Sequence, residues 1–179
     1  MTGNIILISG ISTQAKLIQK FQCKADKESG IWNHSGIRFD TANDMYIVEM
    51  AVIEGRKLKA ACKVTPMLYY TQHVKDGLKI LELVPKFEYN EAIIEGLLMK
   101  YTGTPYDYWS LIHDQVIRTL HKKWVGRTDD KAARKMVCHE FAQFIWNCYH
   151  PGIFPEWWKG DISQAYHSYE FEHMEFTGI

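Results

Sequence analysis

Apolar residues gather in short runs along the first part of the chain. Residues 4–9 (NIILIS) are a nearly continuous apolar run that Gly10 ends, which predicts a buried strand. Residues 13–21 (TQAKLIQKF) follow, and their apolar members recur at roughly helical spacing. This segment therefore predicts a short helix directly after the first strand.

Two further apolar runs flank a turn-rich segment. Residues 31–39 and 45–52 lie on either side of the sequence DTAND at 40–44, an arrangement that is typical of a β-hairpin. Residues 79–84 (KILELV) are ended by Pro85 and predict another strand. The first half of the chain is thus predicted to form mainly strands and turns.

The apolar period changes in the second half of the chain. Residues 91–101 predict a helix with Asn90 as its N-cap, and Asp107 is placed to cap a second helix that runs to Leu120. Residues 136–148 (MVCHEFAQFIWNC) predict a third helix. Strands first and helices second is the pattern of an α+β fold, and we expect an antiparallel sheet with helices packed on one face.

The composition limits the classes of partner. The chain has 179 residues, and we expect one domain over residues 1–179. Lys plus Arg and Asp plus Glu number 21 each, so there is no excess positive charge to neutralise the phosphates of a nucleic acid. No stretch approaches the roughly 20 apolar residues of a transmembrane helix. Residues 118–135 predict a basic, solvated insertion, and residues 151–179 an acidic, Trp-rich C-terminal extension.

The cysteines argue against a metal or disulfide scaffold. Cys23, Cys62, Cys138 and Cys148 are scattered and contain no CxxC pair. Cys138 and Cys148 share a predicted helix, where ten residues rise about 15 Å, too far for a disulfide or for a single zinc ion. The N-terminus shows no signal peptide, so we expect cytoplasmic synthesis with reduced thiols.

Three residues combine a reactive type with a suggestive position. Cys138 begins the third helix, where unpaired backbone N–H groups and the helix dipole favour a thiolate. His34 begins the first hairpin strand, and Glu49 lies on the second. If Phe39 pairs with Asp44, then His34 lies directly opposite Glu49 on one face of the sheet. A nucleophilic thiol needs such an imidazole as its base, and a carboxylate orients the imidazole.

Each of these residues also has a purely structural interpretation. Cys138 is open to being a small core thiol, and His34 a strand histidine bonded to the backbone. A one-residue slip in the hairpin would put His34 and Glu49 on opposite faces. Trp157 and Trp158 are interpreted as packing anchors for the extension, with a substrate platform as the alternative.

Four short motifs, in order, resemble the circularly permuted papain-like branch of the NlpC/P60 superfamily, of which the YiiX/YebB-like proteins are the nearest match. After the first strand they are HSGI at 34–37, VEMA at 48–51, GTPYDY at 103–108 and VCHEF at 137–141. The resemblance covers roughly residues 3–150. It departs from the family where the chain begins Gly-Asn in place of Gly-Asp, and where His139 replaces the usual Ser after the cysteine.

The resemblance implies a papain-like cysteine hydrolase with Cys138 as nucleophile, His34 as base and Glu49 as the third member of the triad. We also expect Ser35, Tyr106 and His139 as candidate substrate-binding residues. Tyr106 and Tyr108 are open to two interpretations, lining a groove or packing in the core. The substrates that the resemblance implies are peptidoglycan peptides or amide- or ester-linked lipids, with no metal or organic cofactor. A leaderless wall hydrolase would be phage-encoded, act after lysis or be exported by another route. The alternative is a non-catalytic lipid- or peptide-binding module on the same fold.

Overall fold

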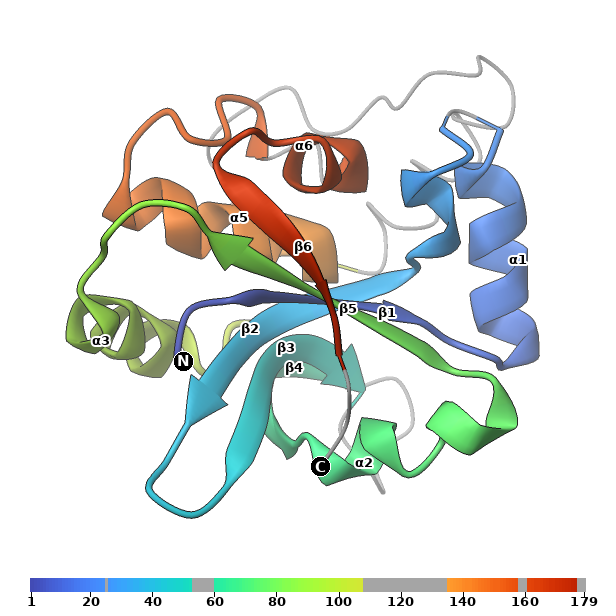
Figure 1. The fold of residues 1–179 in the computed structure, drawn as a ribbon, viewed down its shortest axis with the longest axis horizontal. Helices are drawn as coiled ribbons and strands as arrows, with labels where there is room; N and C mark the ends of the chain where they lie inside the picture. The colour runs from blue at the N-terminus through green and yellow to red at the C-terminus, as the bar shows by residue number, and fades with distance from the viewer. Residues whose placement is uncertain (25, 53–59, 108–134, 158–160, 177–179) are drawn as a thin grey trace.

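Six strands form one antiparallel sheet in the order β4-β3-β2-β1-β5-β6 (Figure 1). The computed structural model describes residues 1–24, 26–52, 60–107, 135–157 and 161–176. The strands are β1 (Ile5–Ser9), β2 (His34–Asp40), β3 (Met45–Val52), β4 (Ala60–Pro66), β5 (Lys79–Pro85) and β6 (Phe171–Glu175). The predicted α+β class with an antiparallel sheet is therefore confirmed.

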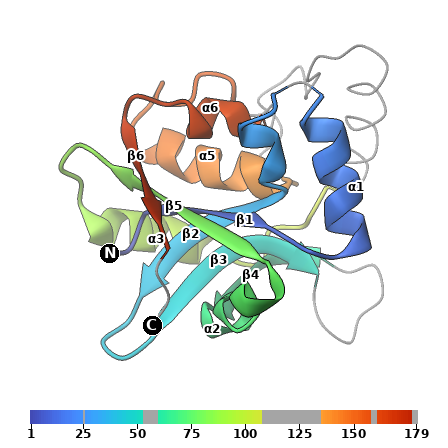
Figure 2. The same ribbon diagram turned by 45° about the vertical axis from the view of Figure 1, so that its right-hand side comes forward.

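Helices cover both faces of this sheet (Figures 1 and 2). The α-helices are α1 (Thr13–Gln22), α2 (Leu68–Thr71), α3 (Glu91–Tyr101), α5 (Cys138–Tyr149) and α6 (Ile162–Tyr166), with 3₁₀ turns η1 (Ser29–Ile31) and η2 (Val74–Asp76). Side chains of α3, α5 and α6 share one buried cluster with the sheet, whereas Met67, before α2, and Tyr70, within it, pack on a second cluster. The expectation that helices lie on one face is wrong, because the chain between β4 and β5 crosses to the other face.

The central strand β1 is buried on both sides. Ile5 and Leu7 point into the cluster under α5, and Ile6 and Ile8 point into the opposite cluster. Successive side chains of a strand face opposite sides of its sheet, so a strand covered on both faces requires a continuous apolar run. This explains the unbroken apolar character of β1 in the sequence.

The hairpin of β2 and β3 forms as predicted, but in a different register. Asp40 pairs with Met45 and Gly36 pairs with Glu49, whereas the predicted pairing was Phe39 with Asp44. The observed register differs by two residues from the prediction, so every side chain stays on the expected face. His34 therefore shares a face with Glu49 but lies diagonally across from it, because the four-residue turn lies at 41–44 rather than at 40–43.

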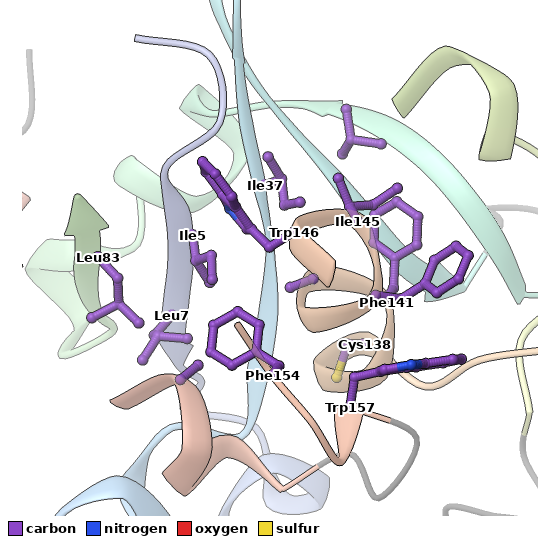
Figure 3. Close-up of a cluster of buried hydrophobic side chains, with 14 of the residues drawn as sticks. Ile5, Leu7, Ile37, Leu83, Cys138, Phe141, Ile145, Trp146, Phe154 and Trp157 are labelled. Carbon is purple, nitrogen blue, oxygen red and sulfur yellow. The ribbon is translucent and has the colours of Figure 1, made fainter. Parts of the chain in front are cut away.

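Helix α5 anchors the larger apolar cluster against the sheet (Figure 3). Phe141 and Trp146 are fully buried, and Trp146 Nε1 donates a hydrogen bond of 2.9 Å to the carbonyl oxygen of Gly3. Phe154 and Trp157, from the C-terminal extension, lie in the same cluster. The position of α5 relative to the sheet is thus set both by apolar packing and by a directional contact.

The two edge strands were not predicted, and some predicted features lie outside the described residues. Strand β4 (AACKVTP) shows no clear apolar alternation, and β6 is mostly exposed. The second predicted helix, most of the basic insertion and Trp158 fall in residues 108–134 and 158–160, which the structure does not describe. Within the described ranges, no helix has the length and apolar character that crossing a bilayer requires.

Candidate active site

Cys138 is the first residue of α5, as its sequence context predicts. The backbone N–H of Val137 donates to Glu140 Oε2 at 2.9 Å, which fixes the entry of the chain into the helix. The first N–H groups of a helix lack partners within it and carry partial positive charge. Cys138 is 4% exposed, so its thiol lies in a sheltered site where these charges are little screened.

His34 and Glu49 are in direct contact across the hairpin. His34 Nε2 lies 2.5 Å from Glu49 Oε2, and the exposed fractions of the two side chains are 19% and 0%. Because the two residues lie diagonally on one face, the side chain of Glu49 extends far enough for its carboxylate to reach Nε2 of the ring. Cys138 interacts with the same imidazole, and both side chains line one pocket. The three residues predicted as a triad therefore meet at one place.

Glu49 is held by two further donors. Thr65 Oγ1 donates to Glu49 Oε1, and the Tyr70 hydroxyl donates to Glu49 Oε2, both at 2.5 Å. Thr65 comes from β4 and lies diagonally from Glu49 on the same face, and Tyr70 comes from α2. Sequence reasoning missed both residues because neither element was predicted. A Glu in an apolar strand was the available signal, since a buried carboxylate requires donors around it.

The contacts shift the protonation equilibria of the pair in opposite directions. Burial disfavours the charged form of His34, but attraction to Glu49 and interaction with Cys138 outweigh it and raise the pKa of His34 to about 10. Burial likewise opposes the charge on Glu49, but attraction to His34 and the hydrogen bonds from His34, Thr65 and Tyr70 lower its pKa. The site thus favours an imidazolium paired with a carboxylate near neutral pH.

A pocket of about 290 Å³ opens beside this cluster. His34 and Cys138 line it, and so do Ala15 and Ile18 from α1 and Tyr70 from α2. The described lining residues are mainly apolar or aromatic and include no Lys, Arg, Asp or Glu. The pocket therefore presents the thiol and the imidazole on a wall whose other described residues, apart from His139 and the tyrosines, carry no ionisable acid or base.

The three candidate substrate-binding residues occupy different positions. Tyr106 and His139 line the pocket. Ser35 is fully buried, is not among the described lining residues, and contacts His139, with Ser35 Oγ 2.7 Å from His139 Nδ1. Tyr106 is also partly buried against the larger apolar cluster, so it both lines the pocket and packs on the core. Tyr108 lies outside the described residues.

The comparisons with known proteins find similarity among solved structures. No family model matches the chain, and no curated protein matches it. The solved structure of YiiX from Escherichia coli O157:H7, titled a metalloprotein of DUF1105, has a TM-score of 0.62 to this chain with 14% sequence identity. The similarity covers 97% of this chain and 96% of that one. The chain therefore has a YiiX-like fold over almost its whole length.

The described residues do not fit a metal site of the usual kind. No group of three or more His, Cys, Asp or Glu side chains within the described ranges is arranged to hold a metal ion. His34 Nε2 bonds to Glu49, and the same ring interacts with Cys138. The imidazole is thus already engaged by these two residues and is not available as a metal ligand. No chemical step at this site is assigned to a metal.

Proposed function

We propose that this protein is a cysteine hydrolase in which Cys138 is the nucleophile, His34 the general base and acid, and Glu49 the residue that orients His34. The observation that carries the proposal is the chain of contacts from Glu49 through His34 to Cys138 at the wall of a pocket. The residue order His, Glu, Cys is that of a circularly permuted papain-like enzyme. The YiiX-like fold supports this architecture but gives no information about the reaction.

The reaction would proceed by acyl transfer. The reactive pair is the imidazolium of His34 and the Cys138 thiolate, formed when the thiol proton resides on the ring, and the thiolate attacks the carbonyl carbon of an amide or ester. Backbone N–H groups at the start of α5 stabilise the oxyanion that forms. His34 then donates the proton to the leaving amine or alcohol, which leaves a thioester on Cys138. Water, deprotonated by His34, attacks the thioester, and the carboxylic acid product and the free thiol are released.

The lining of the pocket favours one part of the implied substrate range. A peptidoglycan peptide carries several charged groups, and a specific site pairs such groups with opposite charges or hydrogen bonds. The described lining residues carry no acidic or basic side chain other than histidine. An uncharged, apolar acyl group linked through an amide or ester therefore suits this pocket better than a cell-wall peptide.

A non-catalytic binding module is the second candidate. An apolar pocket of this size accommodates part of a lipid or peptide whether or not Cys138 reacts. The two functions differ in the reactivity of the thiol, because a binding module has no need of a nucleophile that is ionised in mild acid.

Selective alkylation of Cys138 tests the proposal. At pH 6, where iodoacetamide reacts with thiolates and spares thiols, we expect Cys138 to be labelled at least about 10-fold faster than the other three cysteines. Burial and the charge of Glu49 raise the pKa of Cys62 to about 12, and burial raises the pKa of Cys148, so neither competes. Peptide mass spectrometry after timed labelling measures the four rates.

His34→Ala is the matched control for this experiment. Removal of the imidazole takes away the positive charge beside Cys138, so the fast labelling at pH 6 is expected to disappear while labelling at pH 9 persists. Equal labelling of all cysteines in the native wild-type protein would contradict the assignment of Cys138 as nucleophile and favour the binding module.

A further inference from the structure

Ser35 and His139 form a buried polar contact that the proposed reaction does not use. Ser35 Oγ lies 2.7 Å from His139 Nδ1, and the two residues are 0% and 3% exposed. The contact joins β2 to α5. Neighbouring side chains of these elements, such as Ile37 and Phe141, belong to the apolar core. Apolar contacts tolerate sliding, whereas a hydrogen bond has a defined length and direction, so this contact fixes where the helix meets the strand.

The two residues flank the reactive groups in the sequence. Ser35 follows His34 in β2, and His139 follows Cys138 in α5. Consecutive Cα atoms are about 3.8 Å apart, so the hydrogen bond acts one residue away from each reactive side chain. Side chains alternate across a strand and diverge by about 100° along a helix. The contact therefore ties the two backbone segments together without occupying the space between the thiol and the imidazole.

The two reactive residues are otherwise held by separate parts of the molecule. His34 is held by Glu49, which bonds in turn to Thr65 and Tyr70, so its supports come from the sheet and from α2. Cys138 is placed by the start of α5, where Glu140 accepts from Val137. The contact between β2 and α5 links these two groups of supports.

We propose that the hydrogen bond between Ser35 and His139 sets the position of the Cys138 thiol relative to the His34 imidazole, which makes Ser35 and His139 positioning residues of the site. This inference rests on the proposed function. Loss of the bond lets the start of α5 shift against β2, and the thiol and the imidazole then meet in a smaller fraction of molecules. The thiol loses the charge that favours its ionised form, while the residues that carry out the reaction are unchanged.

The pH profile of Cys138 alkylation tests this role. We expect Ser35→Ala and His139→Leu each to lower the iodoacetamide rate at pH 6 by about 10-fold, and to change the rate at pH 9 by less than about 2-fold, because ordinary cysteine thiols form thiolates at that pH without a neighbouring charge. The double variant is expected to lose no more than either single variant, since both remove the same bond. His139→Asn keeps a hydrogen-bonding group at the δ position and is expected to retain most of the rate at pH 6.

Ile37→Val is the matched control in the same interface. It trims an apolar side chain two residues from Ser35 and lowers stability without touching the hydrogen bond, so the pH profile is expected to stay that of the wild type. Thermal unfolding of each variant establishes that the labelled protein is folded. If Ser35→Ala does not fold, the comparison of His139→Asn with His139→Leu decides the question.

The outcomes separate this proposal from the proposed function. Fast labelling of wild-type Cys138 at pH 6 that persists in Ser35→Ala and His139→Leu overturns the positioning role and leaves the hydrolase proposal intact. An equal loss in Ile37→Val, or equal rates in His139→Asn and His139→Leu, also overturns it, because any loosening of the interface would then suffice. Slow labelling of the wild type overturns both proposals.

Discussion

Glu49 shows at the scale of a residue how a charge is kept inside this fold. A carboxylate with no exposed surface is costly unless hydrogen bonds and an opposite charge compensate it. Here Thr65, Tyr70 and His34 all approach its two oxygens. The hydroxyl of Tyr70 stays protonated, because burial and the nearby charge of Glu49 raise the pKa of Tyr70. All three neighbours thus donate hydrogen bonds to Glu49, and of the three only the imidazole of His34 becomes positively charged.

The stability of the protein is expected to depend on pH through this pair. His34 has a pKa of about 10 in the folded protein and an ordinary value of 6.5, so its stabilising contribution is complete below about pH 6.5 and is lost as the pH rises through about 10. The pKa of Glu49 is lowered, so its contribution is present above its ordinary value of 4.5 and is lost in acid below that value. Between pH 7 and pH 10 we expect the thermal midpoint to fall by more than about 3 °C.

Glu49→Gln is the control for this pH dependence. The amide removes the charge that raises the pKa of His34, so the midpoint of the variant is expected to change less between pH 7 and pH 10. The groups that face His34 include Tyr70 and the Cys138 thiol, so the same pair of measurements is made in a Cys138→Ala background to remove the titration of the thiol. Equal pH dependence with and without the Glu49 carboxylate would show that the pair does not control it.

Gly36 lies where strands β2 and β3 approach so closely that a side chain would clash with the neighbouring strand. It pairs with Glu49 in the ladder between β2 and β3, and it lies two residues from His34. A Cβ at this position would come within 2.6 Å of Ile47 Cγ1 and 2.7 Å of the Val48 carbonyl oxygen. The close approach of β3 to β2 at this point brings the Glu49 carboxylate within reach of the His34 imidazole. The contact between these two side chains therefore depends on the close pairing of the strands.

Two glycine substitutions are expected to have opposite effects on stability. Gly36→Ala forces β2 and β3 apart and is expected to lower the free energy of unfolding by about 1–3 kcal/mol. Gly96→Ala lies in α3, where none of the described atoms beyond the helix's own backbone and the two adjacent residues lies within 4 Å of the added Cβ, and the better helix former is expected to raise stability by about 0.5–1 kcal/mol. Denaturant unfolding of both variants measures the difference. A Gly36→Ala protein as stable as the wild type would mean that the strands separate at no cost.

At the scale of the whole molecule, the C-terminal extension completes the core. Phe154, Trp157 and Phe171 are buried in the cluster that α5 shares with the sheet, and β6 pairs with β5 at the edge of the sheet. Phe171 also meets Trp146 edge to face with ring centroids 5.5 Å apart. Trp157 is therefore a packing anchor, as its sequence context predicts. These contacts favour one folding unit over residues 1–179, which we propose as a single domain.

Removal of the extension is expected to abolish cooperative folding. Deletion of residues 151–179 exposes one face of α5 and the edge of β5, and each large aromatic side chain lost from a core costs about 3–5 kcal/mol against a total stability of about 5–15 kcal/mol. Near-ultraviolet circular dichroism and thermal unfolding of residues 1–150 test this expectation. As a control, removal of residues 177–179 alone leaves the buried aromatic residues and β6 in place. A truncated chain that unfolds cooperatively would place the domain boundary near residue 150.

Prediction from the sequence succeeded where a local pattern is strong. The apolar run of β1, the turn at 40–44 and the helical spacing of α3 and α5 each determine an element by themselves. The face shared by His34 and Glu49 also follows, because a hairpin turn confines the register to a few values and only an odd shift moves a side chain to the other face. Strand β4 escaped prediction because its buried positions are held by Cys62 and Thr65 rather than by large apolar side chains, so its sequence shows no apolar alternation.

The sequence by itself determined the α+β class, the start of a helix at Cys138 and the common face of His34 and Glu49, since each follows from contacts between residues close in the chain. The tertiary structure decided that Cys138 meets His34, 104 positions earlier in the sequence, and that Thr65 and Tyr70 surround Glu49. It also decided that Ser35 binds His139 rather than facing the pocket. Such contacts depend on how α5 and α2 pack on the sheet, and this packing is set by the shape of the whole core rather than by any one segment.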